Sequence, residues 1–277
     1  MTAQESKNYI HLRGSFVFGM LLILVFYRLI SSALLSQMNS PLFLFPQTEW
    51  VYAAVLKSGF LQYITAHYWS AALFDLLLLA TPLLFLLTRL QIFAILFTGL
   101  LLTYYFTFNM VTGHHYHGLV GAILMTIPFW TKNEKPFLLL WDAVRYYLLY
   151  IFASAALWKI LQGSAFHAEQ LPAILQMQQL QLQLELPDSF RAAITQYFIT
   201  HGTVAHIVLL LNTILQLSFA IGFATKKYDK FLLAAFIVFV ISNYAVMGIM
   251  SAELLVLALP LLNWEWVSNK LAISSVD

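Results

Sequence analysis

Lys159 stands at the end of a long apolar stretch, in the sequence YIFASAALWKILQGSAF. A lysine that is partly withdrawn from water is less stable in its charged form, so it can accept a proton from a bound molecule. The same position also suits a lysine whose aliphatic stem lies along the membrane while its ammonium reaches the lipid headgroups. The local sequence leaves both interpretations open.

A second polar cluster comes directly before another apolar run, in GHHYHGLVGAILM, and contains His114, His115, Tyr116 and His117. Imidazoles in such a cluster could shuttle protons, hydrogen-bond a ligand or bind a metal. None of the spacings matches a specific zinc motif such as HExxH, so we predict no metal site. Histidines at a membrane interface often have no ligand, and this is the simpler alternative.

Charged residues elsewhere in the chain could complete a site or anchor the fold. Asp75 and Glu253 each lie near the start of an apolar run, where a carboxylate could orient a histidine or a lysine. Arg28 lies well inside the first apolar run, so a carboxylate or carbonyl groups of a neighbouring helix should meet it. Asp142 and Arg145, at i, i+3 spacing, are expected to pair with each other as a structural anchor.

The composition identifies the environment of these residues as a membrane. Of 277 residues, 61% are hydrophobic and only 9% are charged, and the mean hydropathy is +0.79, which is far from the values of soluble domains. The formal net charge of +2 is too small to suggest nucleic-acid binding. Cysteine is absent, which excludes disulfides and thiolate metal sites.

Apolar runs of about 20 residues are needed to cross a hydrocarbon core of about 30 Å, and the chain contains about eight candidates. We expect spans at residues 14–36, 70–88, 90–109, 117–130, 138–160, 203–223, 231–247 and 250–264, of which the fourth is short. The predicted fold is therefore all-α, a polytopic membrane helix bundle. Residues 1–13 and 265–277 would flank a transmembrane domain at 14–264.

The distribution of lysine and arginine predicts the orientation of the bundle, because basic residues of short loops stay in the cytoplasm. Arg89, Lys132, Lys135 and the basic turn at 226–230 then lie inside, together with both termini. The same orientation puts the polar candidates at the outer side, where we expect a pocket in the inner membrane of a bacterium. These candidates are Asp75, His114, His115, Tyr116, His117, Lys159, His201, His206, Asn243 and Glu253.

A long segment at 161–202 connects two spans on that outer side. Pro172 and Pro187 are compatible with two interfacial helices, at roughly 167–183 and 188–200, which could lie over the pocket as a lid. The alternation QLQLQLEL would also suit a short strand. We prefer helices, because a single strand would have no partner.

The order of motifs resembles the HTTM family, the transmembrane domain of vitamin K-dependent gamma-carboxylases and of many bacterial proteins. The matching stretches are GHHYHGLVGAILM, YIFASAALWKIL, ITHGTVAHIVLLLNTILQLSFAIGF and FIVFVISNYAVMGIMSAELLVLALPLL, within residues 14–264. The resemblance implies that Lys159 is the base that deprotonates a reduced quinone, and that His114 or His115 binds the ligand. His201 with Gly202, and Asn243, match further family positions. The animal enzyme also has a large soluble domain, and without one we do not expect peptide carboxylation here.

Three hypotheses about function follow from these observations. The first is an HTTM-type, carboxylase-like or quinol-dependent enzyme whose cofactor is a reduced quinone. The second is a non-catalytic membrane subunit that binds a lipid, or a membrane or periplasmic protein partner, through the outer segment. The third is a redox-associated membrane protein similar to DoxX, although such proteins typically have four spans. A transporter is less well supported, because the charged residues do not gather at the bilayer midplane.

Overall fold

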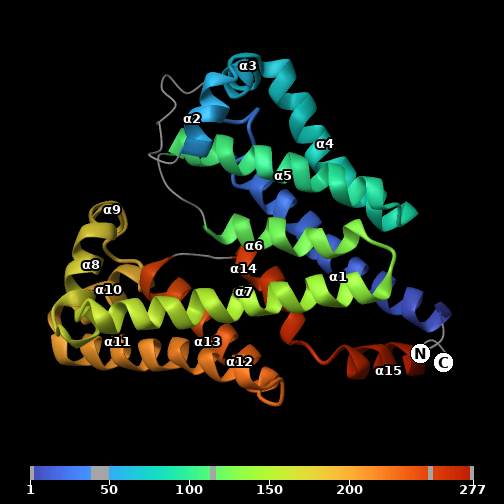
Figure 1. Ribbon diagram of the computed structural model, residues 1–277. Helices are drawn as coiled ribbons and strands as arrows, with labels where there is room; N and C mark the ends of the chain where they lie inside the picture. Colours follow the sequence, from blue (N-terminus) through green and yellow to red (C-terminus); the bar gives the residue numbers. More distant parts are fainter. Residues whose placement is uncertain (1–2, 39–49, 113–116, 249–251, 275–277) are drawn as a thin grey trace. The chain divides into compact units, whose positions relative to one another are not determined.

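The computed structural model of the protein describes residues 3–38, 50–112, 117–248 and 252–274 (Figure 1). Within these ranges, the backbone alone is described for residues 3–8, 112, 117, 252, 269 and 271–274. Every element in the described ranges is helical, and no strand occurs among them. The all-α prediction is confirmed.

Six helices in the described part of the chain are long and apolar enough to cross a membrane, as expected for a multi-pass membrane protein. Four are single helices: α4 (Tyr68–Thr88), α5 (Gln91–Thr112), α7 (Glu134–Leu161) and α13 (Asp229–Met247). A fifth span is the later part of α1 (Ala3–Ile30). The sixth is α11 (Gly202–Leu217), which continues through a 3₁₀ turn, η3 (Ser218–Ala220), into α12 (Ile221–Ala224).

Two of the eight expected spans contain only short helices, and one of them, at 117–130, was expected to be short. The region of 117–130 forms α6 (His117–Thr126) and a 3₁₀ turn, η1 (Ile127–Trp130). The region of 250–264 contains α14 (Ala252–Leu257) and η4 (Leu259–Leu261), before α15 begins (Trp264–Ser274). Pro128 and Pro260 explain both interruptions, because proline removes a backbone donor and clashes with the preceding turn. The count of eight spans stays a prediction.

The segment 161–202 is helical, so the strand alternative is wrong. It contains η2 (Ser164–Phe166), α8 (Gln170–Gln178), α9 (Leu180–Glu185) and α10 (Phe190–Thr200). Pro187 separates α9 from α10, and the Ser189 side chain caps α10 by accepting a hydrogen bond of 3.2 Å from the backbone N–H of Ala192. The remaining short helices are α2 (Trp50–Lys57) and α3 (Phe60–Ala66).

The chain divides into two compact units, and the division falls inside α7. Unit 1 consists of residues 1–144, 252–259 and 265–277. Its core is aromatic: the ring of Phe18 on α1 stacks on Phe85 of α4 with centroids 3.8 Å apart, and Phe129 of η1 meets it edge-on at 5.4 Å. Helices α1, α4, α5 and α6 pack together around these rings.

Unit 2 consists of residues 145–251 and 260–264. Phe152 of α7 stacks on Phe219 with centroids 4.6 Å apart and meets Phe239 of α13 edge-on at 4.8 Å. Gly222 allows the close approach of α7, because a Cβ atom there would lie 2.6 Å from a methyl carbon of Leu149. Helices α8 and α10 pack against α11 and α13 respectively.

Candidate functional site

A cavity of about 350 Å³ lies within unit 2 among α7, α8, α11 and α13. Its walls are mainly apolar, and their side chains recur at the three- and four-residue spacing that brings residues to one helix face. The polar lining consists of Lys159, Asn212, Ser242 and Asn243. The apolar lining consists of Leu171, Ile174, Val208, Leu209, Leu211, Leu215, Val238, Val246 and Met247.

Lys159 lies in the last turn of α7, and its side chain is half-buried. The ammonium Nζ donates a hydrogen bond of 2.8 Å to Oε1 of Gln216, a buried side chain of α11. No carboxylate in the described part of the chain lies within ion-pair distance of this ammonium. An ammonium has three N–H donors, so Lys159 has donors left for a ligand.

Two carboxamides add hydrogen-bonding capacity to the same cavity. The side chains of Asn212 on α11 and Asn243 on α13 both line it, and neither forms a hydrogen bond with another described residue. The hydroxyl of Ser242 donates to the backbone carbonyl of Val238, one turn earlier on α13. Each carboxamide offers both a donor and an acceptor, so the site can bind a polar group of either kind.

The wall that α8 contributes is anchored to the rest of unit 2. Leu171 and Leu175 of α8 pack with Ala205 and Leu209 of α11 in one buried cluster. Because Leu171 also lines the cavity, this part of the expected outer segment closes one side of it. Both the lid over the pocket and its position at the membrane surface stay predictions.

A hydrogen-bonded link ties the same segment to the C-terminal end of α13. Gln179 donates a hydrogen bond of 2.6 Å to the carbonyl oxygen of Met247 and accepts one of 3.2 Å from Arg191 on α10. Gly248 ends α13 with φ of +67°, and Arg191 occupies the space that a Cβ atom would need there. A cation at this position also complements the helix dipole, so the link holds α8–α10 beside the cavity wall.

No family model matches the chain, and neither a curated protein nor a solved structure does. The resemblance to the HTTM family consequently remains a prediction from the motifs. The function must be argued from the geometry of the site.

The structure brings only part of the predicted site together. Lys159 and Asn243 line the same cavity. His201 does not line it: its side chain is exposed, stacks on Tyr197 with ring centroids 4.3 Å apart, and has Nδ1 3.0 Å from the carbonyl oxygen of that residue. His206 has Nε2 3.1 Å from the carbonyl oxygen of Ala165, which ties α11 to η2.

The histidine-rich cluster cannot be placed in this site. His114, His115 and Tyr116 lie outside the described residues, and His117 begins α6 with only its backbone described. Their roles as catalytic or ligand-binding groups stay predictions. In the part of the chain that the structure describes, no group of three His, Cys, Asp or Glu side chains could hold a metal ion.

Asp75 and Glu253 both belong to unit 1, and each has partners in the protein. The carboxylate of Asp75 accepts hydrogen bonds from the backbone N–H groups of Leu35 at 3.2 Å and Ser36 at 2.7 Å. Glu253 forms a buried ion pair with Arg28, which confirms the expectation that a carboxylate meets this arginine. These contacts give both acids structural roles, and their part in ligand binding stays a prediction.

The expected pair of Asp142 with Arg145 is wrong. Arg145 binds Asp229 in the first turn of α13, with Nε 2.9 Å from Oδ2 and Nη2 2.5 Å from Oδ1. Asp142 instead acts electrostatically on Arg13 of α1. The long side chain of Arg145 thus reaches a carboxylate of another helix in place of the one that is close in sequence.

Three polar residues in and beside the cavity were not among the predicted site residues: Asn212, Gln216 and Ser242. Asn212 and Gln216 are four residues apart in LLLNTILQL, so they share one face of an otherwise apolar span. Polar residues inside a span face the interior of a bundle or a cavity far more often than lipid. The four-residue spacing of Asn212 and Gln216 therefore indicates, from the sequence alone, a polar helix face that could meet Lys159.

Proposed function

We propose that the Lys159 cavity binds the oxygen-bearing head of an amphipathic membrane molecule, and that this molecule is the isoprenoid quinone or quinol implied by the HTTM resemblance. The observation that carries the proposal is a cation that has no carboxylate partner among the described residues, in a cavity that is otherwise lined mainly by apolar side chains. Binding sites for small molecules are typically apolar with a few convergent polar groups.

The composition of the cavity supports a separate role for each part of such a molecule. The leucine, valine, isoleucine and methionine side chains would contact the ring and the first part of an isoprenoid chain. Lys159 and the carboxamides of Asn212 and Asn243 would hydrogen-bond to the ring oxygens. The volume of about 350 Å³ is at the lower end of ligand pockets, so the remainder of a long chain would extend into lipid.

Lys159 supports a chemical step beyond binding. In its neutral form the amine would accept the proton of a quinol hydroxyl, so that the O–H bond breaks and an N–H bond forms. The products are a quinolate anion and an ammonium, and these opposite charges then stabilise each other, with the oxyanion serving as the counter-ion of the ammonium. Gln216 would hold one N–H of the amine throughout and so orient its lone pair toward the ligand.

The finer features of the predicted architecture belong to this proposal. Both termini would be cytoplasmic, eight segments would lie within the membrane, and the segment 161–202 would rest on its outer surface. The protein would then be an HTTM-type protein of a bacterial inner membrane. The basic residues near the ends of the long helices support this orientation by the positive-inside rule.

The test is to purify the full chain in a mild neutral detergent and to identify the co-purifying lipids by mass spectrometry. The wild-type protein should retain a quinone, and Lys159→Met and Asn243→Leu should lose most of it. Lys57→Met is a matched control, because Lys57 also lies in the last turn of a helix but belongs to unit 1. Retention of the same quinone in Lys159→Met and wild type would rule out the proposed site.

Lys159→Arg separates binding from proton transfer. Arginine keeps a positive charge but does not lose its proton in proteins, so it cannot act as a base. We expect this variant to retain the quinone, whereas addition of the quinol should give the absorbance of the quinolate only with wild type. A quinolate signal of equal size in Lys159→Arg would assign the base to another group.

A second candidate function is that of a lipid- or protein-binding subunit without chemistry. It is favoured by exposed apolar side chains along α8–α10, which include Met177 at 82%, Leu184 at 73% and Phe190 at 80% exposure. Such side chains suit contact with a membrane surface or with a partner. If the wild type and both cavity variants retain only bulk phospholipid, this candidate replaces the first.

A further inference from the structure

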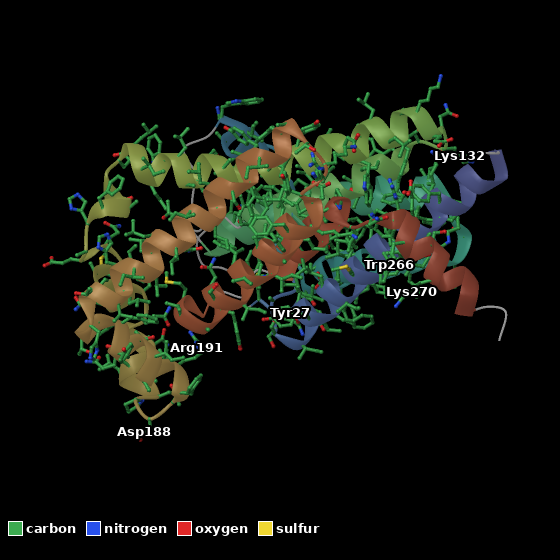
Figure 2. All side chains as sticks on the ribbon, turned by 90° about the horizontal axis from the view of Figure 1, so that it is seen from below. Tyr27, Lys132, Asp188, Arg191, Trp266 and Lys270 are labelled. Carbon is green, nitrogen blue, oxygen red and sulfur yellow. The ribbon has the colours of Figure 1, made fainter. Side chains whose placement is uncertain are left out.

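A second cavity, of about 370 Å³, lies within unit 1 at one end of its long helices. It is formed by the N-terminal part of α1, the C-terminal end of α4, the start of α5, and the turn after η1. Lys132 of this turn lies close to the N-terminal part of α1 (Figure 2). Residues far apart in the sequence are therefore gathered around one opening.

The polar lining of this cavity is basic. His11, Arg89 and Lys132 line it, and no aspartate or glutamate does. Thr88, Gln91 and Thr131 add neutral hydrogen-bonding groups, while Ile10, Phe85 and Phe129 form the apolar part. A cavity that gathers positive charge without a carboxylate has the electrostatic character of an anion site.

Arg89 is the best-defined group in this cavity. Its Nη2 donates a hydrogen bond of 2.7 Å to Oγ of Ser15, whose hydroxyl donates to the backbone carbonyl of His11 at 3.0 Å. Its Nη1 is buried and has no hydrogen-bond partner among the described residues. A buried donor without an acceptor is destabilising, so a ligand oxygen at this position would be favoured.

The backbone and the environment of Arg89 agree with this interpretation. Arg89 ends α4 in the left-handed region with φ of +59°, where glycine is usual, and its N–H donates to the carbonyl of Phe85 at 2.8 Å. Arginine at this position is strained compared with glycine. Burial lowers the pKa of the guanidinium below its usual value, and a bound anion would offset that loss.

We propose that this cavity binds a phosphate group, either that of an anionic phospholipid or that of a soluble phosphate compound. The guanidinium fork of Arg89 matches two oxygens of a phosphate, and Lys132 adds a flexible second cation. The lipid source is favoured by the three apolar side chains beside the basic groups, which can contact the glycerol region. The cytoplasmic leaflet is rich in anionic lipid, and the basic turns are expected to face it.

Short-chain lipids allow the proposal to be tested with the full-length protein in a neutral detergent. The binding of dihexanoyl phosphatidylglycerol, dihexanoyl phosphatidylcholine and inorganic phosphate would each be measured by isothermal titration calorimetry. We expect the anionic lipid to bind about tenfold or more tightly than the zwitterionic one, because both carry the same phosphodiester but the choline cation of the second would be repelled by Arg89 and Lys132. If inorganic phosphate binds as tightly as the anionic lipid, the ligand is a soluble phosphate compound.

The variants distinguish a built site from a basic surface. Arg89→Gln should weaken binding of the anionic ligand by about tenfold, and Lys132→Gln by about threefold. Lys135→Gln is the matched control, since Lys135 is exposed and close in sequence but does not line the cavity. If Arg89→Gln does not fold, Arg89→Lys can be tested in its place. This variant keeps the positive charge but loses the guanidinium fork, so it should bind the anionic ligand with intermediate affinity.

Two results would overturn this proposal. One is binding of neither the anionic lipid nor phosphate above the level of the zwitterionic lipid. The other is an equal loss of affinity in Lys132→Gln and Lys135→Gln, which would indicate attraction by surface charge in place of a site. Neither result bears on the quinone proposal, because the two cavities belong to separate units.

Discussion

Arg145 and Lys159 are basic residues of the same helix, α7, and both belong to unit 2, but their surroundings differ. Arg145 is 1% exposed, and its guanidinium contacts both carboxylate oxygens of Asp229. It also donates to the carbonyl oxygens of Gly222 and Thr225, at 3.1 and 3.4 Å. Lys159 donates to an uncharged amide and lines a cavity. Asp229 neutralises the first charge, whereas the described part of the chain provides no counter-ion for the second.

This difference indicates which charge serves folding and which serves binding. Arg145 joins α7 to the turn between α12 and α13, because its partners end one helix and begin the next. Lys159 has lost part of its hydration without gaining an opposite charge from the described residues, so its ammonium is not fully compensated. An oxygen atom of a ligand would interact with the ammonium in place of the lost water, and the cavity provides the space for such a ligand.

Arg145→Met should cause the largest loss of stability. The substitution removes the cation and leaves the carboxylate of Asp229 and two backbone carbonyls without their donor. We expect the free energy of unfolding to fall by about 3–5 kcal/mol, as for other broken buried pairs. Unfolding in mixed micelles of a neutral detergent and dodecyl sulfate, followed by tryptophan fluorescence, would measure it.

The double variant Arg145→Met, Asp229→Asn is the control for this prediction. It removes the remaining negative charge as well, so part of the lost stability should return. A loss below about 1 kcal/mol for the single variant is typical of an exposed pair, and it would contradict the anchoring role.

Gly222→Ala should have the next largest effect, because the Arg145 end of unit 2 is closely packed. The new methyl group would lie 2.6 and 2.8 Å from the two methyl carbons of Leu149, so α7 and α12 would have to move apart. We expect a loss of about 1–3 kcal/mol in the same unfolding measurement. Gly202→Ala is the matched control with open space around it, and it should change stability by less than about 0.5 kcal/mol. Equal effects of both substitutions would contradict the difference in packing.

The parts of the fold that could be read from the sequence are those with a local signal. Continuous apolar runs located six long helices, and the apolar position of Arg28 predicted its buried carboxylate partner. The fourth candidate span was expected to be short, whereas the eighth was expected to be one apolar run at 250–264, although Pro260 interrupts it. Proline changes the length of a helix without changing the hydropathy of its window.

The candidate site was harder to derive, because its partners come from distant segments. Lys159 was identified from its position near the end of a span, and Asn243 from the predicted orientation and the family resemblance. The sequence around Lys159 did not predict that Gln216 would hold the lysine. Asp142 was the nearest carboxylate to Arg145 in the sequence, whereas the true partner is 84 residues away. Spacing on one helix indicates which residues share a face, and only tertiary packing determines what that face meets.

Gln179→Leu should have a moderate effect, on the link that holds α8–α10 to the end of α13. The substitution leaves the carbonyl of Met247 without its donor and Arg191 without its acceptor. We expect a loss of about 1–2 kcal/mol in stability, and faster proteolysis within 161–202 by a protease added to the purified protein. Gln178→Leu, at the exposed neighbouring position, should leave both properties unchanged. Identical proteolysis of the two variants would mean that Gln179 does not anchor the segment.

Lys159→Met should have the smallest effect on stability and should still remove the bound ligand. Methionine fills nearly the same space as the lysine stem, and removal of a half-buried charge offsets the lost hydrogen bond to Gln216. We therefore expect a change within about 1 kcal/mol in the unfolding measurement, together with loss of the quinone in mass spectrometry.

The double variant Lys159→Met, Gln216→Leu leaves no polar group of this pair unsatisfied and should be at least as stable as the single one. A loss for Lys159→Met as large as that for Arg145→Met would instead make Lys159 a second anchor of the fold. If Lys159→Met is as stable as the wild type but no longer retains the quinone, the interactions of Lys159 contribute to binding and not to folding. A side chain with no net effect on the free energy of unfolding can then stabilise only the complex with the ligand.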